Sequence, residues 1–476
     1  MAKRKKSTFE RLHSGALNRQ QRRELGRRLD SNDPGLQVVH ADAAGIDVGN
    51  ASHFVAVPPD RDQAPVREFG SWTDDLRKMA EWLKSCRIRT VAMQSTGVYW
   101  IALQEVLEAA GLEVYLVNAR GTKNLPGRKS DVQECQWLLK LHTYGLLRNS
   151  FRPPEEIRLV RRMWRLRDRW VEDAGRAIQQ MQKALTSMNV QLANAISDIS
   201  GVTGMAIIRA IVEGERDPWK LTKLRDRRII ASEEEIARSL EGNWRQEVVF
   251  ELSQVVEAYD FFRKKMDECD SQLKTYMAAL PTRELACAGT AEIVPASRKG
   301  TRRKNDPGFD LRTELRRALG VDVTAVDGVD VLTGQVLLSE VGADLSAFPT
   351  ENHFAAWLEL APRRDVSGGK VIRHVKADGR NRLANALRMA AQALSRSDSY
   401  LGARYRSLRG RLGGPRANKA MARYLACLLY RLLTRGQAYV DRGAAYYQQR
   451  QNQRDRTRLE RKAASLGFKL VALTQN

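Results

Sequence analysis

Residues 44–57 read AGIDVGNASHFVAV, and this stretch decides the fold expected for the amino-terminal part of the chain. Its two apolar runs, 44–48 and 53–57, predict a β-hairpin. The same patterns predict, in order, a strand over 67–72, a helix over 74–86, a strand over 90–94, a helix over 98–109, a strand over 114–117, and a helix capped by Ser130 that runs to about Tyr144. Three early strands followed by alternating helices and strands are the element order of a ribonuclease-H-like fold.

Composition restricts the class of protein. The 476 residues exceed what one hydrophobic core usually covers, so two or three domains are expected. A net charge of +24 predicts a polyanionic partner, with nucleic acid ahead of a membrane surface. Because no long apolar run or secretory signal is present, we expect a soluble, intracellular chain with no membrane partner. Five scattered cysteines without a CxxC pair support neither a zinc site nor a disulfide framework.

The expected fold class is α/β plus all-α. The predicted parts are a basic amino-terminal arm (1–38), a ribonuclease-H-like domain (39–152), a helical connector (153–281), a flexible basic loop (282–308), a carboxy-terminal helical domain (309–442) and a polar tail (443–476). The opening of the carboxy-terminal domain, 326–334, leads into a helix over 335–341. It resembles a helix-hairpin-helix element, in which a glycine turn offers backbone N–H groups to a phosphate.

The first turns of the connector carry a stripe of arginines next to tryptophans. We expect the stripe to contact nucleic acid through Arg158, Arg161, Arg162, Arg165 and Trp164. An ordinary amphipathic helix with its tryptophans in the core is an equally good interpretation of Trp164.

Three carboxylates are the candidate metal ligands. Asp47 lies on the first strand between Ile46 and Val48, and an acid on a central strand is costly to bury unless it binds a cation or a donor. Asp131 and Glu134 are three residues apart on one helix face, a spacing that alone is usually a solvated or capping feature. In a ribonuclease-H-like domain such acids meet at one edge and hold divalent ions, for which Mg²⁺ is suited.

Ser367 is the candidate nucleophile. Gly368 and Gly369 follow it and permit close approach of a phosphate. Three cations, Arg363, Arg364 and Lys370, are placed to neutralise charge in a transition state. A plain Ser-Gly-Gly turn is the alternative. No histidine or other base lies near Ser367 in the sequence, so we expect the metal cluster to meet it in space.

The chain resembles the insertion sequence 110 family of transposases, closest to its 1111 subgroup. The resemblance rests on 45–49, 94–100, 127–137, 197–218, 321–342 and 367–370, in that order. It implies a RuvC-like domain, a coiled-coil connector and a carboxy-terminal serine transposase domain. It also implies recombination of donor and target DNA guided by a structured noncoding bridge RNA. We expect Arg128 and Lys129, in the third motif, to contact nucleic acid as well.

The family's Asp-Glu-Asp-Asp metal set corresponds to Asp47, Gln94, Asp131 and Glu134, and its serine nucleophile to Ser367. The chain departs at two positions, because Glu134 replaces an aspartate and Gln94 replaces a glutamate. An amide oxygen still binds a cation but brings no charge, and Glu105 on the following helix is an alternative source of that charge. The resemblance further implies a composite site between protomers of a dimer to tetramer, in the bacterial cytoplasm and on the nucleoid when DNA is bound.

Three hypotheses follow. The first is a Mg²⁺-dependent, RNA-guided serine recombinase that moves its own insertion sequence. The second is an RNA- and DNA-binding derivative that Gln94 has impaired catalytically. The third is a metal nuclease on branched DNA in which Ser367 is idle.

Overall fold

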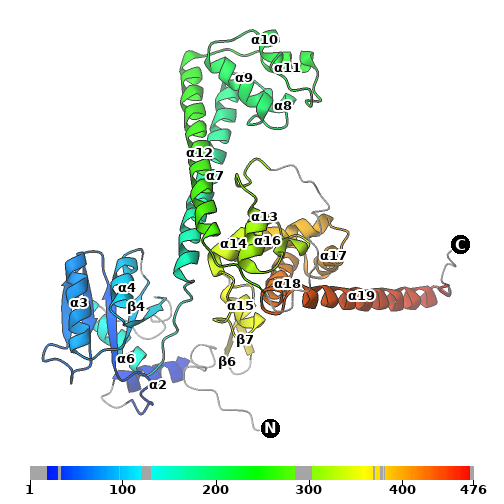
Figure 1. The fold of residues 1–476 in the computed structure, drawn as a ribbon. Coiled ribbons are helices and arrows are strands. Elements are labelled where there is room, and N and C mark those ends of the chain that lie inside the picture. The colour runs from blue at the N-terminus through cyan, green and yellow to red at the C-terminus, as the bar shows by residue number, and fades with distance from the viewer. Residues whose placement is uncertain are drawn as a thin grey trace. The chain divides into compact units, whose positions relative to one another are not determined.

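The structure, a computed structural model, describes residues 19–30, 34–95, 97–118, 130–284, 303–367, 370–375, 379 and 381–471 (Figure 1). The chain divides into two compact units. The first comprises Met1–Arg152 with Pro362–Lys376, and the second comprises Pro153–Ala361 with Ala377–Asn476. The predicted combination of an α/β amino-terminal part with a helical remainder is confirmed.

The first unit contains a five-stranded mixed sheet. Its elements are α2 (Arg19–Asp30), β1 (Ala43–Val48), β2 (Ser52–Ala56), β3 (Val66–Gly70), α3 (Thr73–Ser85), β4 (Thr90–Gln94), α4 (Trp100–Ala109), β5 (Glu113–Val117) and α6 (Asp131–Thr143). The strand order is β3-β2-β1-β4-β5, with β1 antiparallel to β2 and parallel to β4. Each strand and helix predicted from the alternation and periodicity of this region is present, with bounds shifted by no more than two residues.

Alternation along the strands divides the core of this unit into two layers. Ile46 and Val48 pack with α3 and α4 on one face of the sheet. Ala92 and Val117 pack with α6 and α2 on the other face. The helix α2 lies in the segment predicted to be a basic arm, and it buries Leu25 and Leu29 against α6. Part of that arm therefore belongs to the folded unit.

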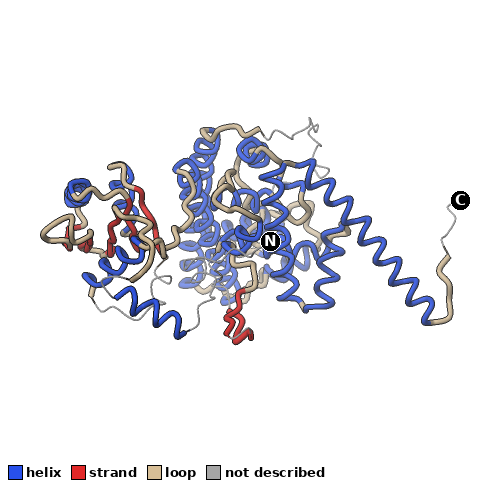
Figure 2. The backbone as a smooth tube through the Cα atoms, turned by 90° about the horizontal axis from the view of Figure 1, so that it is seen from below, coloured by secondary structure: helices blue, strands red, loops and turns tan. Residues whose placement is uncertain are grey.

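Besides the five-stranded sheet, the described residues form a two-stranded antiparallel hairpin of β6 (Arg363–Ser367) and β7 (Lys370–Val375) (Figure 2). The expectation of a purely helical carboxy-terminal domain was wrong at this point. The sequence does carry a hairpin signal, because Gly368-Gly369 separates two runs that suit strands. Both glycines lie outside the described residues.

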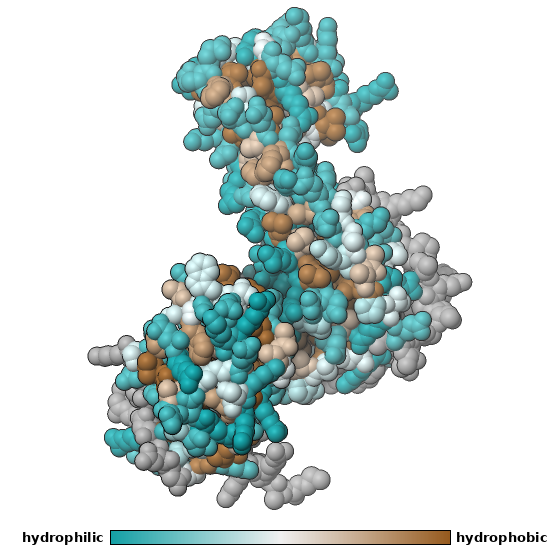
Figure 3. Space-filling model, turned by 60° about the vertical axis from the view of Figure 1, so that its left-hand side comes forward, coloured by the Kyte–Doolittle hydropathy of each residue, from teal (hydrophilic) through white to brown (hydrophobic). Residues whose placement is uncertain are grey.

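The second unit is helical, and two long antiparallel helices dominate its first part. They are α7 (Glu155–Ser187) and α12 (Gln246–Ala278). Early residues of α7 meet late residues of α12, as in the Arg167–Asp270 ion pair, while Arg245 at the start of α12 reaches Ser187. Short helices join the distant ends of the pair: α8 (Leu192–Ala195), α9 (Val202–Val212), α10 (Pro218–Thr222) and α11 (Glu233–Ser239). Figure 3 shows brown apolar patches among teal polar surface on this tip.

The carboxy-terminal helices complete the second unit. They are α13 (Leu311–Leu319), η1 (Val323–Ala325), α14 (Val331–Val341), α15 (Glu351–Trp357), α16 (Arg382–Ala393), η2 (Leu394–Arg396), α17 (Tyr400–Leu412), α18 (Gly414–Arg435) and α19 (Gln437–Ser465). The helix predicted over 335–341 begins earlier, because Asp330 caps it by accepting the backbone N–H of Thr333 at 2.9 Å. The predicted basic loop lies outside the described residues over 285–302.

None of the helices in the described ranges combines the length and the apolar character needed to cross a membrane.

Candidate functional site

Three elements of the first unit bring the predicted metal ligands together. β1 carries Asp47, β4 ends on Gln94, and the first turns of α6 carry Asp131 and Glu134. Gly45 makes this arrangement possible. A Cβ atom at Gly45 would lie 2.2 Å from the backbone N of Leu139 and 2.3 Å from the carbonyl O of Cys135, so the α6 backbone rests directly on β1. Because strand side chains alternate, Asp47 shares the face of Gly45 and points to the side on which α6 lies.

The local sequence also fixes the start of α6. Ser130 caps the helix by accepting the backbone N–H of Gln133 at 3.4 Å, as predicted. Asp131 and Glu134 then lie in the first turn, where the helix dipole favours negative charge. The two side chains differ in exposure, since Asp131 is exposed and Glu134 is half-buried.

Like charges crowd around Asp47. Its pKa is raised to about 6, first by partial burial and then by repulsion from Glu134 and Asp131. A backbone hydrogen bond from Val48 acts in the opposite direction. The described structure provides Asp47 with no cationic side chain to offset this repulsion. A carboxylate whose charge is disfavoured in this way gains the most from a bound cation.

Gln94 interacts with one of these acids. Its side chain is 7% exposed, and its amide Nε2 donates a hydrogen bond to Oε2 of Glu134 at 3.2 Å. A neutral donor at this position relieves repulsion that a glutamate would add. Glu105 does not replace the missing charge here. It lies on α4, which packs on the opposite face of the sheet from α6, and its nearest cation is Arg152 at 3.9 Å.

The donor chemistry of these residues fits a hard divalent cation, because every contributing atom is a carboxylate or amide oxygen. Among the described residues, no three acidic, histidine or cysteine side chains are already arranged as a metal site. Cys135, next to Glu134, is not a competing ligand or nucleophile, since burial raises the pKa of its thiol to about 12.

Ser367 is the last residue of β6 and pairs with Lys370, the first residue of β7. Arg363 and Arg364 lie on β6, opposite Val375 and His374. The register is irregular between Asp365 and Val366, one residue before Ser367. The backbone therefore places the predicted nucleophile beside the tip of a hairpin, within the same compact unit as the α/β sheet.

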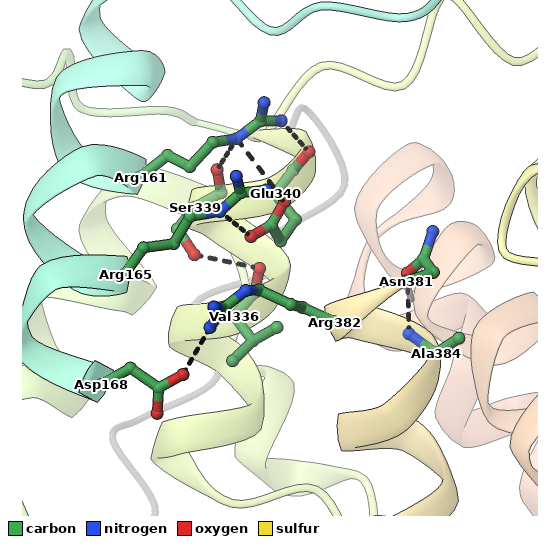
Figure 4. Close-up of polar contacts among 9 residues, drawn as sticks. All are labelled: Arg161, Arg165, Asp168, Val336, Ser339, Glu340, Asn381, Arg382 and Ala384. Carbon is green, nitrogen blue, oxygen red and sulfur yellow. Dashed lines mark hydrogen bonds and ion pairs between the residues drawn. The ribbon is translucent and has the colours of Figure 1, made fainter. Parts of the chain in front are cut away.

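The connector arginines make contacts inside the second unit (Figure 4). Arg165 forms a bidentate pair with Glu340, with distances of 2.9 Å and 2.6 Å. Arg161 donates to the backbone carbonyls of Ser339 and Glu340 on α14. One turn further along α7, Asp168 accepts from Arg382 of α16 at 2.5 Å. These contacts fasten α7 to the carboxy-terminal helices.

The remaining connector residues differ among themselves. Trp164 is 6% exposed. Of the two interpretations of this side chain, contact with nucleic acid and packing in the core, the structure supports packing in the core. Arg158 approaches Glu155 at 4.0 Å, while Arg162 is exposed and has no partner among the described side chains. Arg128 and Lys129 lie outside the described residues. Their contact with nucleic acid stays a prediction.

Sequence reasoning missed three features of this site. It did not predict that Gly45 lets α6 approach, that Gln94 donates to Glu134, or that Glu340 binds Arg161 and Arg165. A glycine two residues before an acid, on the same face of a central strand, was the available signal for the first. The other two join residues far apart in the sequence and left no local signal.

Two family models match the chain. Residues 44–190 match the DEDD transposase model of IS110 elements, described as a transposase, and residues 322–406 match a model described as Transposase IS116/IS110/IS902 family. The first match contains Asp47, Gln94, Asp131 and Glu134, and the second contains Ser367. The fold and the two family matches together identify the chain as a transposase. The chain belongs to the IS110 family, which confirms the resemblance at family level. No curated protein matches it.

Membership has two direct consequences. A DEDD-type transposase domain implies dependence on a divalent metal. Transposases bind DNA, so DNA is a partner of this chain.

Proposed function

We propose that this chain is an RNA-guided recombinase that moves a bacterial insertion sequence by exchanging DNA strands through a covalent bond to Ser367. The observation that carries the proposal is the crowding of Asp47, Asp131 and Glu134 on the α6 side of β1. These acids occur in one chain with a second transposase match that spans Ser367. Carboxylates for a metal and a hydroxyl for covalent attack are the two parts that such a reaction needs.

In the proposed reaction, the Oγ atom of Ser367 attacks a DNA phosphorus. The new O–P bond forms as the bond to the leaving strand's oxygen breaks, and the released oxygen takes a proton. The phosphoserine link keeps the bond energy, so the reverse attack by a different strand end completes the exchange without a further cofactor. Asp47, Asp131, Glu134 and the amide oxygen of Gln94 would hold Mg²⁺, which when bound stabilises negative charge on the reacting phosphate.

The sheet topology supports a ribonuclease-H-like, RuvC-like assignment for the first unit. Three strands form an antiparallel meander and two more add in parallel on the β1 side, in the order β3-β2-β1-β4-β5. Asp47 on the central strand and Gln94 at the end of the neighbouring strand occupy one edge of this sheet. This is the edge at which such a fold gathers its acids.

RNA guidance, pairing of donor and target DNA, and a composite site between protomers of a tetramer are proposed on the family resemblance. The net charge of +24 suits two polyanionic partners. Base pairing would then select the target, leaving the protein to contact the backbone.

Gln94 favours a second candidate, a binding protein with impaired catalysis, because it removes one of four expected charges. A metal nuclease with an idle Ser367 is the third. One experiment separates the three: purified protein, Mg²⁺, cognate guide RNA and paired donor and target DNA are incubated, and a covalent protein–DNA adduct is sought on a denaturing gel. The recombinase gives an adduct that Ser367→Ala abolishes. Intact RNA binding without adduct or cleavage supports the binding protein, and cleavage that survives Ser367→Ala but not Asp47→Asn supports the nuclease.

A further inference from the structure

The helices α17 and α18 carry positive charge without any acid among them. Between Asp398 and Asp441 the sequence contains nine Lys or Arg and no Asp or Glu. The two helices pack against each other, and Gly413 lies between them. Most surfaces mix charges of both signs, so a run of this length and sign is a distinct feature of the second unit.

Packing directs these cations to the solvent. Leu401 and Tyr405 of α17 are buried, as are Met421 and Leu425 of α18. Arg416, Lys419 and Arg423 are spaced i, i+3 and i+7, which places them along one face of α18 over roughly 10 Å. On α17, Arg409 and Arg411 are exposed. We refer to Arg409, Arg411, Arg416, Lys419 and Arg423 as the cationic α17–α18 face.

Three of these nine cations, Arg409, Arg411 and Arg416, differ from the others in how they are bonded. Of the nine cations, Arg431 is bonded to a carboxylate, that of Glu351. Arg404 lies over the ring of Tyr424 at 4.2 Å, and Arg423 donates to the amide oxygen of Asn352. Arg409, Arg411 and Arg416 have no hydrogen-bond or ion-pair partner in the described part of the chain. Arg165 differs from these three arginines because its guanidinium group is paired with the carboxylate of Glu340.

We propose that the cationic α17–α18 face binds the phosphate backbone of duplex DNA. Unpaired guanidinium groups that repel one another are stabilised by a polyanion, and their fork geometry matches phosphate oxygens. A duplex fits better than a single strand. No large apolar or aromatic side chain of α17 or α18 is among the exposed ones in the described residues, and single strands are held by base stacking.

We assign DNA as the polyanion bound at this face because the chain belongs to a transposase family. All five residues of the face lie beyond the second family match, which ends at residue 406. The inference rests on the DNA-acting part of the proposed function and is independent of whether Ser367 is the nucleophile. Backbone contacts of this kind give affinity and orientation without reading sequence.

The test is a binding titration of the full-length chain with a DNA duplex of about 30 base pairs, followed by fluorescence anisotropy without divalent ions so that no strand is cut. The triple variant Arg409→Gln, Arg411→Gln, Arg416→Gln removes three unpaired charges. At about 0.15 M salt we expect affinity to fall tenfold or more, and the slope of log K against log salt to decrease by about 2 to 3.

A matched triple in the tip, Lys220→Gln, Lys223→Gln, Arg227→Gln, removes the same charge from an exposed region where three glutamates begin α11. Its affinity should fall by less than about threefold. Equal losses in both triples overturn the proposal, since net charge alone would then explain binding. Unchanged DNA binding with weakened binding of a duplex RNA overturns it too.

A charge-preserving triple, Arg409→Lys, Arg411→Lys, Arg416→Lys, keeps most of the affinity if phosphates are bound. It loses as much as the glutamine triple if the substitutions merely disturb the fold, which contradicts the proposal. Because the readout is binding without divalent ions, a failure of the serine mechanism is distinguishable from a failure of this surface.

Discussion

Two carboxylate sites in this protein have opposite electrostatics. At the junction of α7 and α14, Glu340 is almost buried and meets Arg165 in a bidentate pair, with Arg161 beside it. At the end of β1, Asp47 meets Glu134 and Asp131, and its pKa is raised to about 6. The first arrangement neutralises the carboxylate with arginines of the same chain, whereas the described residues provide no cation for the second. The difference separates an acid that stabilises the fold from acids that we propose bind a metal ion.

The largest effect is expected from Asp47→Asn. The substitution removes a proposed metal ligand, so formation of the proposed covalent DNA adduct should slow by roughly 10³-fold or more. Folding stability should not fall, because the removed charge is repelled by Glu134 and Asp131. Single-turnover adduct formation and thermal unfolding without divalent ions measure the two effects. Glu81→Gln, an exposed change on α3, is the control and should alter neither. A stability loss at Asp47→Asn with unchanged activity would reverse the comparison.

Glu340→Ala should produce the opposite pattern. Its side chain is 8% exposed and binds two arginines, and because Arg165 is 44% exposed and can be solvated, removal of the carboxylate should cost about 1 to 2 kcal/mol of stability in the second unit. Chemical denaturation of the full chain gives the value. Arg162→Ala, one residue from Arg161 but exposed and without a partner among the described residues, should stay within about 0.5 kcal/mol of the parent protein. Equal effects of the two variants would show that the junction does not stabilise the unit.

His142 of α6 is a buried titratable side chain that stays neutral in the folded protein, unlike the carboxylates of the two sites above. It is 1% exposed, contacts Thr90 at 2.9 Å, and burial, with a smaller contribution from His40, lowers its pKa to about 3. Below about pH 6.5 the unfolded chain takes up a proton that the folded chain does not, so stability falls as the pH is lowered. Between about pH 7.5 and about pH 5, the wild type should lose about 2 kcal/mol more than His142→Gln, because other groups titrate alike in both. Parallel pH profiles of the two proteins would exclude this role for His142.

The sequence predicted the strands and helices of the first unit well and the long-range contacts of both units poorly, for one physical reason. Alternation and helical periodicity are local, and they define β1, β4 and α6 without knowledge of the rest of the chain. The partners of Arg165 and Gln94 are set by packing, and they lie 175 and 40 residues away. An arginine stripe therefore could not be recognised as structural until Glu340 was seen against it. Ser367 is intermediate, because its Gly-Gly turn was visible in the sequence while the strands around it were not predicted.

Gln94→Glu should have the smallest and most specific effect of these substitutions. It restores the glutamate of the family's metal set and adds a further uncompensated carboxylate next to Glu134, whereas the carboxylate of Glu340 is compensated by arginines. Without a cation, the new carboxylate loses the hydrogen bond to Glu134 and adds repulsion, which should cost about 1 to 2 kcal/mol. With Mg²⁺ the added ligand should strengthen binding about tenfold, so the thermal midpoint recovers as Mg²⁺ is added. Gln104→Glu is the matched control. Gln104 is equally buried and donates to Glu108 at 2.5 Å, but it lies on α4, so its variant should lose stability that Mg²⁺ does not restore. Rescue of both variants, or of neither, would mean that the crowded acids around Asp47 are not the metal site.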